Sequence, residues 1–439
     1  MQTASEVRTR FPLELASLLC FSLPLNLGAQ RVPPPPPPAL DSLAARLRVP
    51  TDSLARYRAI SAMEESYFHS TREAVAAAID TLVAELRDHD PDLRYWAAEG
   101  ITVIIARAPR ETQVAAIQPL LDVAVRDTSP AARSTAVRAF WQLGAVGCPA
   151  MPTLLTLASD PDPGMRWRVA AAFGDIGLEC LPNRIAAQVL AVLRADVADS
   201  DDMVRLYAVQ SLGELGAAGT AGLSAALAGS DSLAAGDAAG SLGQLPPTAD
   251  VVEPLLRALS APAANVRLNA AYALGGFGPP VREQLMRAAQ SRSGPVRDAA
   301  RKGIEFYEHA ARSHVANRCY AVAIGTWMPD LALGADTIFL RAPPLVRFTT
   351  VKYDHYVILD TLPPYQVQPA SLTPRSPGWI GYWEPVGDSV RVGWSNGFSG
   401  FGATFGATAD TLRGTAISHW DFNREPQMAA ITFAAAPCP

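Results

Sequence analysis

The sequence predicts an α-solenoid of stacked helical hairpins, followed by a small all-β antiparallel domain that is either a barrel or a sandwich. One short phrase recurs along the middle of the 439-residue chain: an acid-and-proline turn, an Arg, small and apolar residues, then Leu-Gly or Ile-Gly. Its clearest copies lie at 165–177 and 204–216. Repeats at intervals of about 20 to 50 residues are typical of solenoids, whose units bury apolar surface only against their neighbours. After Ala316 the helical spacing stops, and short alternating runs bounded by Gly, Pro, Asn and Asp begin, as in antiparallel sheets.

The repeated arginines measure the length of the unit. They fall at intervals of 39, 33, 39, 62 and 30 residues, and the gap of 62 holds a degenerate copy at 234–245, with Ala235 in place of Arg. Each copy follows an apolar pattern with helical spacing, so each unit is expected to be a hairpin of two helices. Glycines fall where helices are expected to end, at Gly144, Gly177, Gly216 and Gly278. We call the repeated arginines the Arg row: Arg94, Arg133, Arg166, Arg205, Arg267 and Arg297.

The turns of this array carry a family resemblance. Asp-Pro precedes the Arg at 160–166 and at 90–94, and Val-Arg, Ala-Ala and Leu-Gly follow in the same order along the phrase. Residues 88–317 resemble the HEAT repeat family, in particular its short bacterial form. The resemblance implies the fold but indicates almost nothing about an activity. Residues 39–87 are expected to add two or three capping helices, one of them starting at Ser70 or Thr71, since an open solenoid end must stay soluble.

The first residues have the layout of a secretory signal. Arg8 and Arg10 precede an apolar stretch at 11–27, and small residues follow it. Residues 1–29 are therefore predicted to be a signal peptide, and the alternative is an uncleaved membrane anchor. A proline-rich linker at 30–38 follows, which indicates an extended spacer. The predicted location is the periplasm or the outside of the cell, with the membrane as a partner only if the leader stays uncleaved.

Cysteine usage agrees with export. Without the leader, four cysteines remain, and Cys319 and Cys438 bracket the last segment almost end to end. In an oxidising compartment such a pair is expected to form a disulfide. Cys148 and Cys180 occupy matching loops of adjacent repeats. Neighbouring repeats usually lie farther apart than the roughly 7 Å that a disulfide spans between Cα atoms. The sequence therefore leaves undecided whether these two cysteines form a disulfide.

Two rows of side chains are candidates for function in the array. The Arg row could bind anions along a stripe. However, Asp residues recur ahead of four of these arginines, and stacking would place each Asp near the Arg of a neighbouring repeat. The resemblance implies that such a ladder is structural. Ion-pair networks often perturb the pKa values of their members without forming a functional site.

The second candidate row is aromatic. On the second helices, large rings fall at matching positions that are expected to face away from the core, and Tyr207 lies one residue off that line. Aromatic anchors give large contact area and often dominate binding, whereas the alternative is that these rings pack against the next repeat. The predicted binding residues are Tyr95, Trp141, Trp167, Tyr207 and Tyr272.

The last segment, 318–439, is expected to form a closed antiparallel meander. Gly325-Thr326-Trp327 resembles the Gly-x-Trp mark of lipocalin-like barrels, which implies a barrel that either holds a small apolar ligand or is filled by its own side chains. The predicted strands are 319–327, 337–341, 346–351, 356–360, 379–384, 389–394, 402–407, 411–417 and 429–433.

Charge and motifs exclude several functions. The formal net charge is -5, which gives no footprint for nucleic acid. The six histidines are scattered, and no phosphate loop, Gly-x-Ser-x-Gly, His-Glu-x-x-His or Cys-x-x-Cys is present. We therefore expect no metal, no cofactor and no catalysis. The leading hypothesis is an exported, non-enzymatic scaffold whose solenoid binds a protein or peptide. The alternatives are a carrier of a small apolar ligand and a HEAT-like enzyme of the lyase type.

Overall fold

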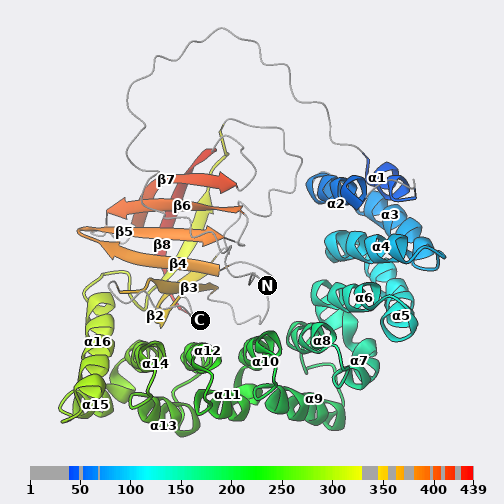
Figure 1. Ribbon diagram of the computed structural model, residues 1–439. Helices are drawn as coiled ribbons and strands as arrows, with labels where there is room; N and C mark the ends of the chain where they lie inside the picture. Colours follow the sequence, from blue (N-terminus) through cyan, green and yellow to red (C-terminus); the bar gives the residue numbers. More distant parts are fainter. Residues whose placement is uncertain are drawn as a thin grey trace, which may run out of the picture. The chain divides into compact units, whose positions relative to one another are not determined.

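The computed structural model confirms a helical solenoid followed by a β-barrel (Figure 1). The chain divides into Met1–Pro36 and Pro37–Pro439, and every described residue belongs to the second unit. The predicted signal peptide and linker lie outside the described residues. The structure describes residues 39–48, 53–67, 70–328, 345–353, 362–369, 380–395, 399–406, 411–420 and 427–438.

The helices pair into hairpins that stack side by side, and the second helices form the inner row in Figure 1. The outer row is α1 (Leu40–Arg46), α3 (Arg72–Glu85), α5 (Arg110–Arg126), α7 (Met151–Leu157), α9 (Asn183–Asp196), α11 (Thr220–Leu227), α13 (Ala249–Ala258) and α15 (Pro279–Ala288). The inner row is α2 (Ser53–Tyr67), α4 (Pro91–Ile104), α6 (Pro130–Leu143), α8 (Pro163–Ile176), α10 (Asp202–Glu214), α12 (Ser232–Leu242), α14 (Ala264–Gly276) and α16 (Gly294–Ala311). Short 3-10 helices η1 (Ile105–Arg107), η2 (Gly144–Ala150) and η3 (Gly216–Gly219) lie in connections.

The helix boundaries follow from caps that the repeat encodes. Asp90, Asp162, Asp201 and Asp231 each accept hydrogen bonds from backbone N–H groups of the first turn, as N-cap residues do. Thr71 caps α3 in the same way. The glycines expected at helix ends all have positive φ, a conformation that favours Gly. Their φ values are 50° at Gly144, 78° at Gly177, 60° at Gly216 and 69° at Gly278.

Glycines inside the inner row allow neighbouring helices to approach closely. A Cβ on Gly303 of α16 would overlap the carbonyl oxygen of Ala271 on α14. A Cβ on Gly275 of α14 would likewise overlap the carbonyl oxygen of Gly303. The glycine of the repeated phrase therefore serves two purposes, since it ends some helices and lets others touch through their backbones.

Within the described residues, eight strands close into an antiparallel barrel in chain order, and β1 pairs with β8 from Cys319–Ala436 to Ile324–Ile431. Two of the predicted strands, 337–341 and 356–360, lie outside the described residues. One observed strand, β3, was not predicted, because Pro363 and Pro364 precede it and Pro369 ends it, so that the segment reads as a loop. The strands are β1 (Cys319–Ile324), β2 (Leu345–Lys352), β3 (Tyr365–Pro369), β4 (Ile380–Val386), β5 (Ser389–Ser395), β6 (Ser399–Gly406), β7 (Thr411–Trp420) and β8 (Met428–Ala436).

Aromatic rings in mutual contact fill the interior of the described part of the barrel. Phe433 is central: its ring centroid lies 5.8 Å from that of Trp394, 5.8 Å from Phe348 and 5.1 Å from Phe405. All four side chains are buried. Trp327, the last residue of the Gly-x-Trp mark, follows β1 and lies edge-on to Phe401, with ring centroids 5.7 Å apart.

The barrel packs on the last helices of the solenoid through β2 and β3. Thr350 donates a hydrogen bond of 2.8 Å to the carbonyl oxygen of Gly276, at the end of α14. Tyr365 donates one of 2.8 Å to the carbonyl oxygen of Phe306 on α16, and the two rings stack at 4.5 Å. Phe306 and Tyr272 share one buried apolar cluster with the barrel interior. The solenoid and the barrel are therefore continuous in their core.

Both cysteine pairs form disulfides: the expected Cys319–Cys438 bridge and the Cys148–Cys180 bridge that the sequence left undecided. The Cα atoms of Cys319 and Cys438 lie 5.2 Å apart, and this bridge joins the start of β1 to the residues after β8. The Cα atoms of Cys148 and Cys180 lie 6.3 Å apart, within the reach of a disulfide. The stacking of adjacent repeats thus brings these matching loops closer than neighbouring repeats usually come.

Candidate functional site

Three large rings from successive inner helices meet at one place, which we call the ring cluster: Trp141 of α6, Trp167 of α8 and Tyr207 of α10. Trp167 and Tyr207 stack with centroids 4.7 Å apart, and Trp141 lies 5.5 Å from Trp167 and 5.9 Å from Tyr207. The indole N–H of Trp141 donates to the carbonyl oxygen of Arg168 at 3.0 Å. All three rings are partly buried, so they join three repeats and still present part of their surface to solvent.

Charged groups lie beside the ring cluster. The guanidinium of Arg168 lies over the ring of Trp167, 4.1 Å from its centroid, which is a cation–π contact. On the neighbouring helices, Arg138 of α6 pairs with Glu99 of α4, whose side chain is 11% exposed. Burial, and then repulsion from Arg138, lower the pKa of Arg168. An arginine stays charged even so. The guanidinium of Arg168 is therefore a partly desolvated cation that lies near the second cation, Arg138.

Tyr95 of α4 borders the same charges. Its ring packs edge-on against Trp96 with centroids 4.9 Å apart. Burial raises the pKa of the Tyr95 phenol, and the carboxylate of Glu99 raises it further. Tyr95 therefore stays neutral and extends the aromatic surface toward the start of the array.

The structure corrects the expectation for Tyr272. This side chain is only 1% exposed, and its ring packs against Phe306 at 5.2 Å in the cluster shared with the barrel. It is therefore not available to an outside partner. The sequence pattern placed Tyr272 on the right face of its helix, but the barrel covers that face.

The inner face of α14 shows how this row of positions can hold an extended strand. Leu268 packs against the barrel cluster, and Asn269 accepts a hydrogen bond of 2.7 Å from the buried ammonium group of Lys352 on β2. The carbonyl oxygen of Lys352 in turn accepts from Gln244, just after α12, at 3.2 Å. Side chains of successive repeats thus contact one strand of the barrel.

The Arg row has a common structural role within each hairpin. Each of its six members donates through Nη1 to the backbone carbonyl oxygen six residues earlier, in the turn that precedes its own helix. The donor–acceptor distances are 2.8 Å for Arg94, 3.4 Å for Arg133, 3.0 Å for Arg166, 2.8 Å for Arg205, 2.8 Å for Arg267 and 3.5 Å for Arg297.

Ion pairs also join neighbouring repeats, as the ladder hypothesis expected. Arg94 binds both carboxylate oxygens of Asp127, and Arg166 those of Asp199, at 2.5 to 2.9 Å. The hydrogen bonds from Arg166 lower the pKa of Asp199. These geometries match the bidentate pairing of guanidinium and carboxylate, so the arginines are used within the array.

The ladder contains members that the sequence pattern did not single out. Arg205 pairs at 2.7 Å with Asp231, which belongs to the degenerate repeat that lacks the Arg itself. Arg56 of α2 pairs with Asp90 at 2.9 Å, so the segment expected to cap the array already contains the same contact. The signal for Arg56 was present, since a Leu-Ala-Arg-Tyr phrase at 54–57 resembles Leu-Arg-Tyr at 93–95.

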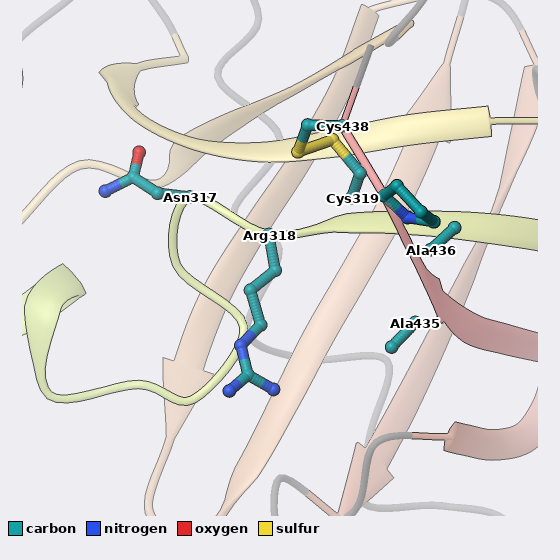
Figure 2. A pocket seen from close by; sticks show the side chains of 7 residues that line it. Asn317, Arg318, Cys319, Ala435, Ala436 and Cys438 are labelled. Carbon is teal, nitrogen blue, oxygen red and sulfur yellow. A yellow bond between two sulfur atoms is a disulfide. The ribbon is translucent and has the colours of Figure 1, made fainter.

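An open hollow of about 390 Å³ lies beside the Cys319–Cys438 disulfide (Figure 2). It is lined by residues 317–319 and 435–438, and the side chain of Arg318 extends away from the disulfide. Its lining has one charged side chain and no convergent polar groups, which is unlike the usual small-molecule site.

Among the described residues, no helix combines the length and apolar character that crossing a bilayer requires. Within those same ranges, no three His, Cys, Asp or Glu side chains gather where they could hold a metal ion.

Fold and site together define an α-solenoid of helical hairpins whose last repeats carry a β-barrel. Residues 117–213 and 220–305 match the family model for HEAT repeats, so the helical array is a HEAT-repeat solenoid. No curated protein matches the chain.

Two similar solved structures are both crystal structures of engineered proteins from the Northeast Structural Genomics Consortium. One is 19% identical over 61% of this chain and 77% of its own, with a TM-score of 0.37. The other is 20% identical over 53% of this chain and 93% of its own, with a TM-score of 0.34.

Proposed function

We propose that this protein is an exported, non-enzymatic interaction scaffold that binds an extended protein or peptide segment on the inner helices α4 to α10. The observation that carries the proposal is the ring cluster, which presents partly exposed aromatic surface next to charged groups on a rigid row of helices. Rings and arginines of this kind supply most of the affinity at protein interfaces.

The disulfides support the exported location. Two disulfides fit an extracellular protein, because reducing compartments rarely keep them. The predicted signal peptide at 1–29 would provide the route.

The other hypotheses gain less support. In the described part of the barrel, rings in contact occupy the interior where an apolar ligand would bind. A lyase-type activity would need a constellation of reactive groups, and the charged residues at the ring cluster are paired or stacked in structural contacts.

Selection from a random peptide library on the full chain tests the proposal. Wild-type protein is expected to enrich a recognisable family of peptides, and Trp141→Ala with Tyr207→Ala to bind them at least about 10-fold more weakly, since losing a central ring costs 1–2 kcal/mol or more. Tyr57→Ala is the matched control, because Tyr57 is 58% exposed on α2, outside the cluster. Enrichment that is absent, or equal in the ring variant, contradicts the proposal.

A further inference from the structure

Within the chain itself, the face of α14 that is equivalent to this surface binds strand β2 of the barrel. Asn269 lies two residues after Arg267 on α14, and Arg168 lies two residues after Arg166 on α8. The two side chains therefore occupy equivalent positions on the inner face. At α14 the position receives the ammonium group of Lys352 from strand β2. At α8 the same position carries a cation, so the complementary group on a bound strand must be an anion.

Arg168 also has hydrogen-bonding capacity that the described part of the chain does not use. Its Nη1 donates to the carbonyl oxygen of Gly164 at 2.8 Å. Its Nε is buried and has no hydrogen-bond partner among the described residues. A guanidinium carries five N–H donors, and a buried donor without a partner is costly.

A second cation near the site, Arg138, also favours an anionic group on the bound segment. Arg138, 31% exposed on α6, pairs with the largely buried carboxylate of Glu99. Glu99 is thus already committed to Arg138, and an added anion would be attracted by both guanidinium groups. The apolar neighbours are the rings of Trp141 and Tyr207, whose centroids lie 5.9 Å apart.

We propose that the segment bound on α4 to α10 is extended and acidic, with one carboxylate that pairs with Arg168 and apolar side chains that pack on Trp141 and Tyr207. This inference rests on the proposed function and adds the chemistry of the partner. Two features support it: the charge of the site, and the continuity of this row with the face of α14 that holds β2. Bidentate pairing between guanidinium and carboxylate would give both affinity and register.

A double-mutant cycle on the selected peptides tests the inference. Asp and Glu are expected to be enriched at one position, and replacing that residue by Asn or Gln should weaken binding to the wild-type chain about 10-fold. The same peptide change should have no effect on Arg168→Gln. Arg168→Lys, which keeps the charge, should retain part of the discrimination. Arg126→Gln is the control, since Arg126 is 79% exposed on the outer helix α5.

The possible outcomes separate the two proposals. If the wild-type chain selects no peptides, the proposed function fails. If the peptides need the ring cluster but are neutral or basic, or if the acid contributes equally with Arg168→Gln, the proposed function stands and this inference is wrong. Self-association of the full chain that Trp141→Ala abolishes would assign the surface to a second copy and also overturn it. Thermal unfolding of each variant verifies that it is folded.

Discussion

Two neighbouring carboxyl groups of this array have pKa values shifted in opposite directions, because their partners differ. Asp199 accepts hydrogen bonds from Arg166, and its pKa is lowered. Asp196, one turn earlier at the end of α9, is 9% exposed. Burial and repulsion from Asp199 raise the pKa of Asp196 to about 7, and attraction by Arg166 only partly offsets them. Asp196 is therefore mostly protonated in the folded protein at mildly acidic pH.

This carboxyl should make stability depend on pH. Its pKa rises from 3.8 in the unfolded chain to about 7 in the folded one. The contribution of this carboxyl to the free energy of unfolding is therefore fully present below pH 3.8 and is lost as pH rises through 7. Between pH 5 and pH 8, the free energy of unfolding of Asp196→Asn is expected to increase by about 2 kcal/mol relative to that of the wild type. Urea unfolding of both proteins at the two pH values measures this gain. A difference that does not change with pH would contradict the assignment.

At the residue scale, the sequence predicted some members of the site and could not predict others. Trp141, Trp167 and Tyr207 were predicted from their positions on the repeat, and the structure brings them together. Tyr272 occupies an equivalent face but is buried, because the segment that covers it lies about a hundred residues later in the chain. Such a long-range contact leaves no trace in a local pattern. Arg168 was missed because its role depends on which neighbouring side chains surround it.

At the scale of the helix, contact between backbones determines where glycine is required. The caps and helix ends were predictable, because Asp, Pro and Gly act locally on their own backbone. The close approach of α14 and α16 at Gly275 and Gly303 requires the geometry of two stacked repeats. Strand β3 was unpredictable for a similar reason, since its pairing with β2 and β4 outweighs the prolines beside it.

Gly303→Ala should disrupt this approach. The new Cβ would overlap the carbonyl oxygen of Ala271, and only movement of one helix backbone could relieve the overlap. We expect a loss of about 2–4 kcal/mol, in the range of severe overpacking. Gly294→Ala is a matched control on the same helix, because the nearest atom to its Cβ would be 3.6 Å away. Chemical unfolding measures both variants. A similar stability for the two would show that the helices adjust without cost.

At the scale of the whole molecule, the barrel closes the C-terminal end of the array. Without it, Tyr272, Phe306 and Ala310 would lose the barrel side chains that bury them. A solenoid repeat is stabilised by its neighbours, and a terminal repeat needs a cover. The barrel supplies this cover through β2 and β3.

A chain that ends at residue 317 tests this role. Helices α14 and α16 should lose protection against amide hydrogen exchange, since their buried face becomes solvated, whereas α4 to α8 should keep theirs. Exchange measured by mass spectrometry on the full and shortened chains compares these helices directly. Unchanged protection in α14 and α16 would mean that the barrel is only attached to the array and does not stabilise it.

The contacts of β2 also have a mechanical consequence. Gln244, Asn269 and Gly276 all bond to this strand, and Phe306 bonds to β3, so one stiff barrel holds three successive hairpins at fixed spacing. Elastic bending of a solenoid is spread over the interfaces between its units. Before α12 the neighbouring hairpins are joined in another way, by the rings of three repeats and by the Cys148–Cys180 disulfide. The scaffold is therefore expected to offer a guest a surface of nearly fixed curvature.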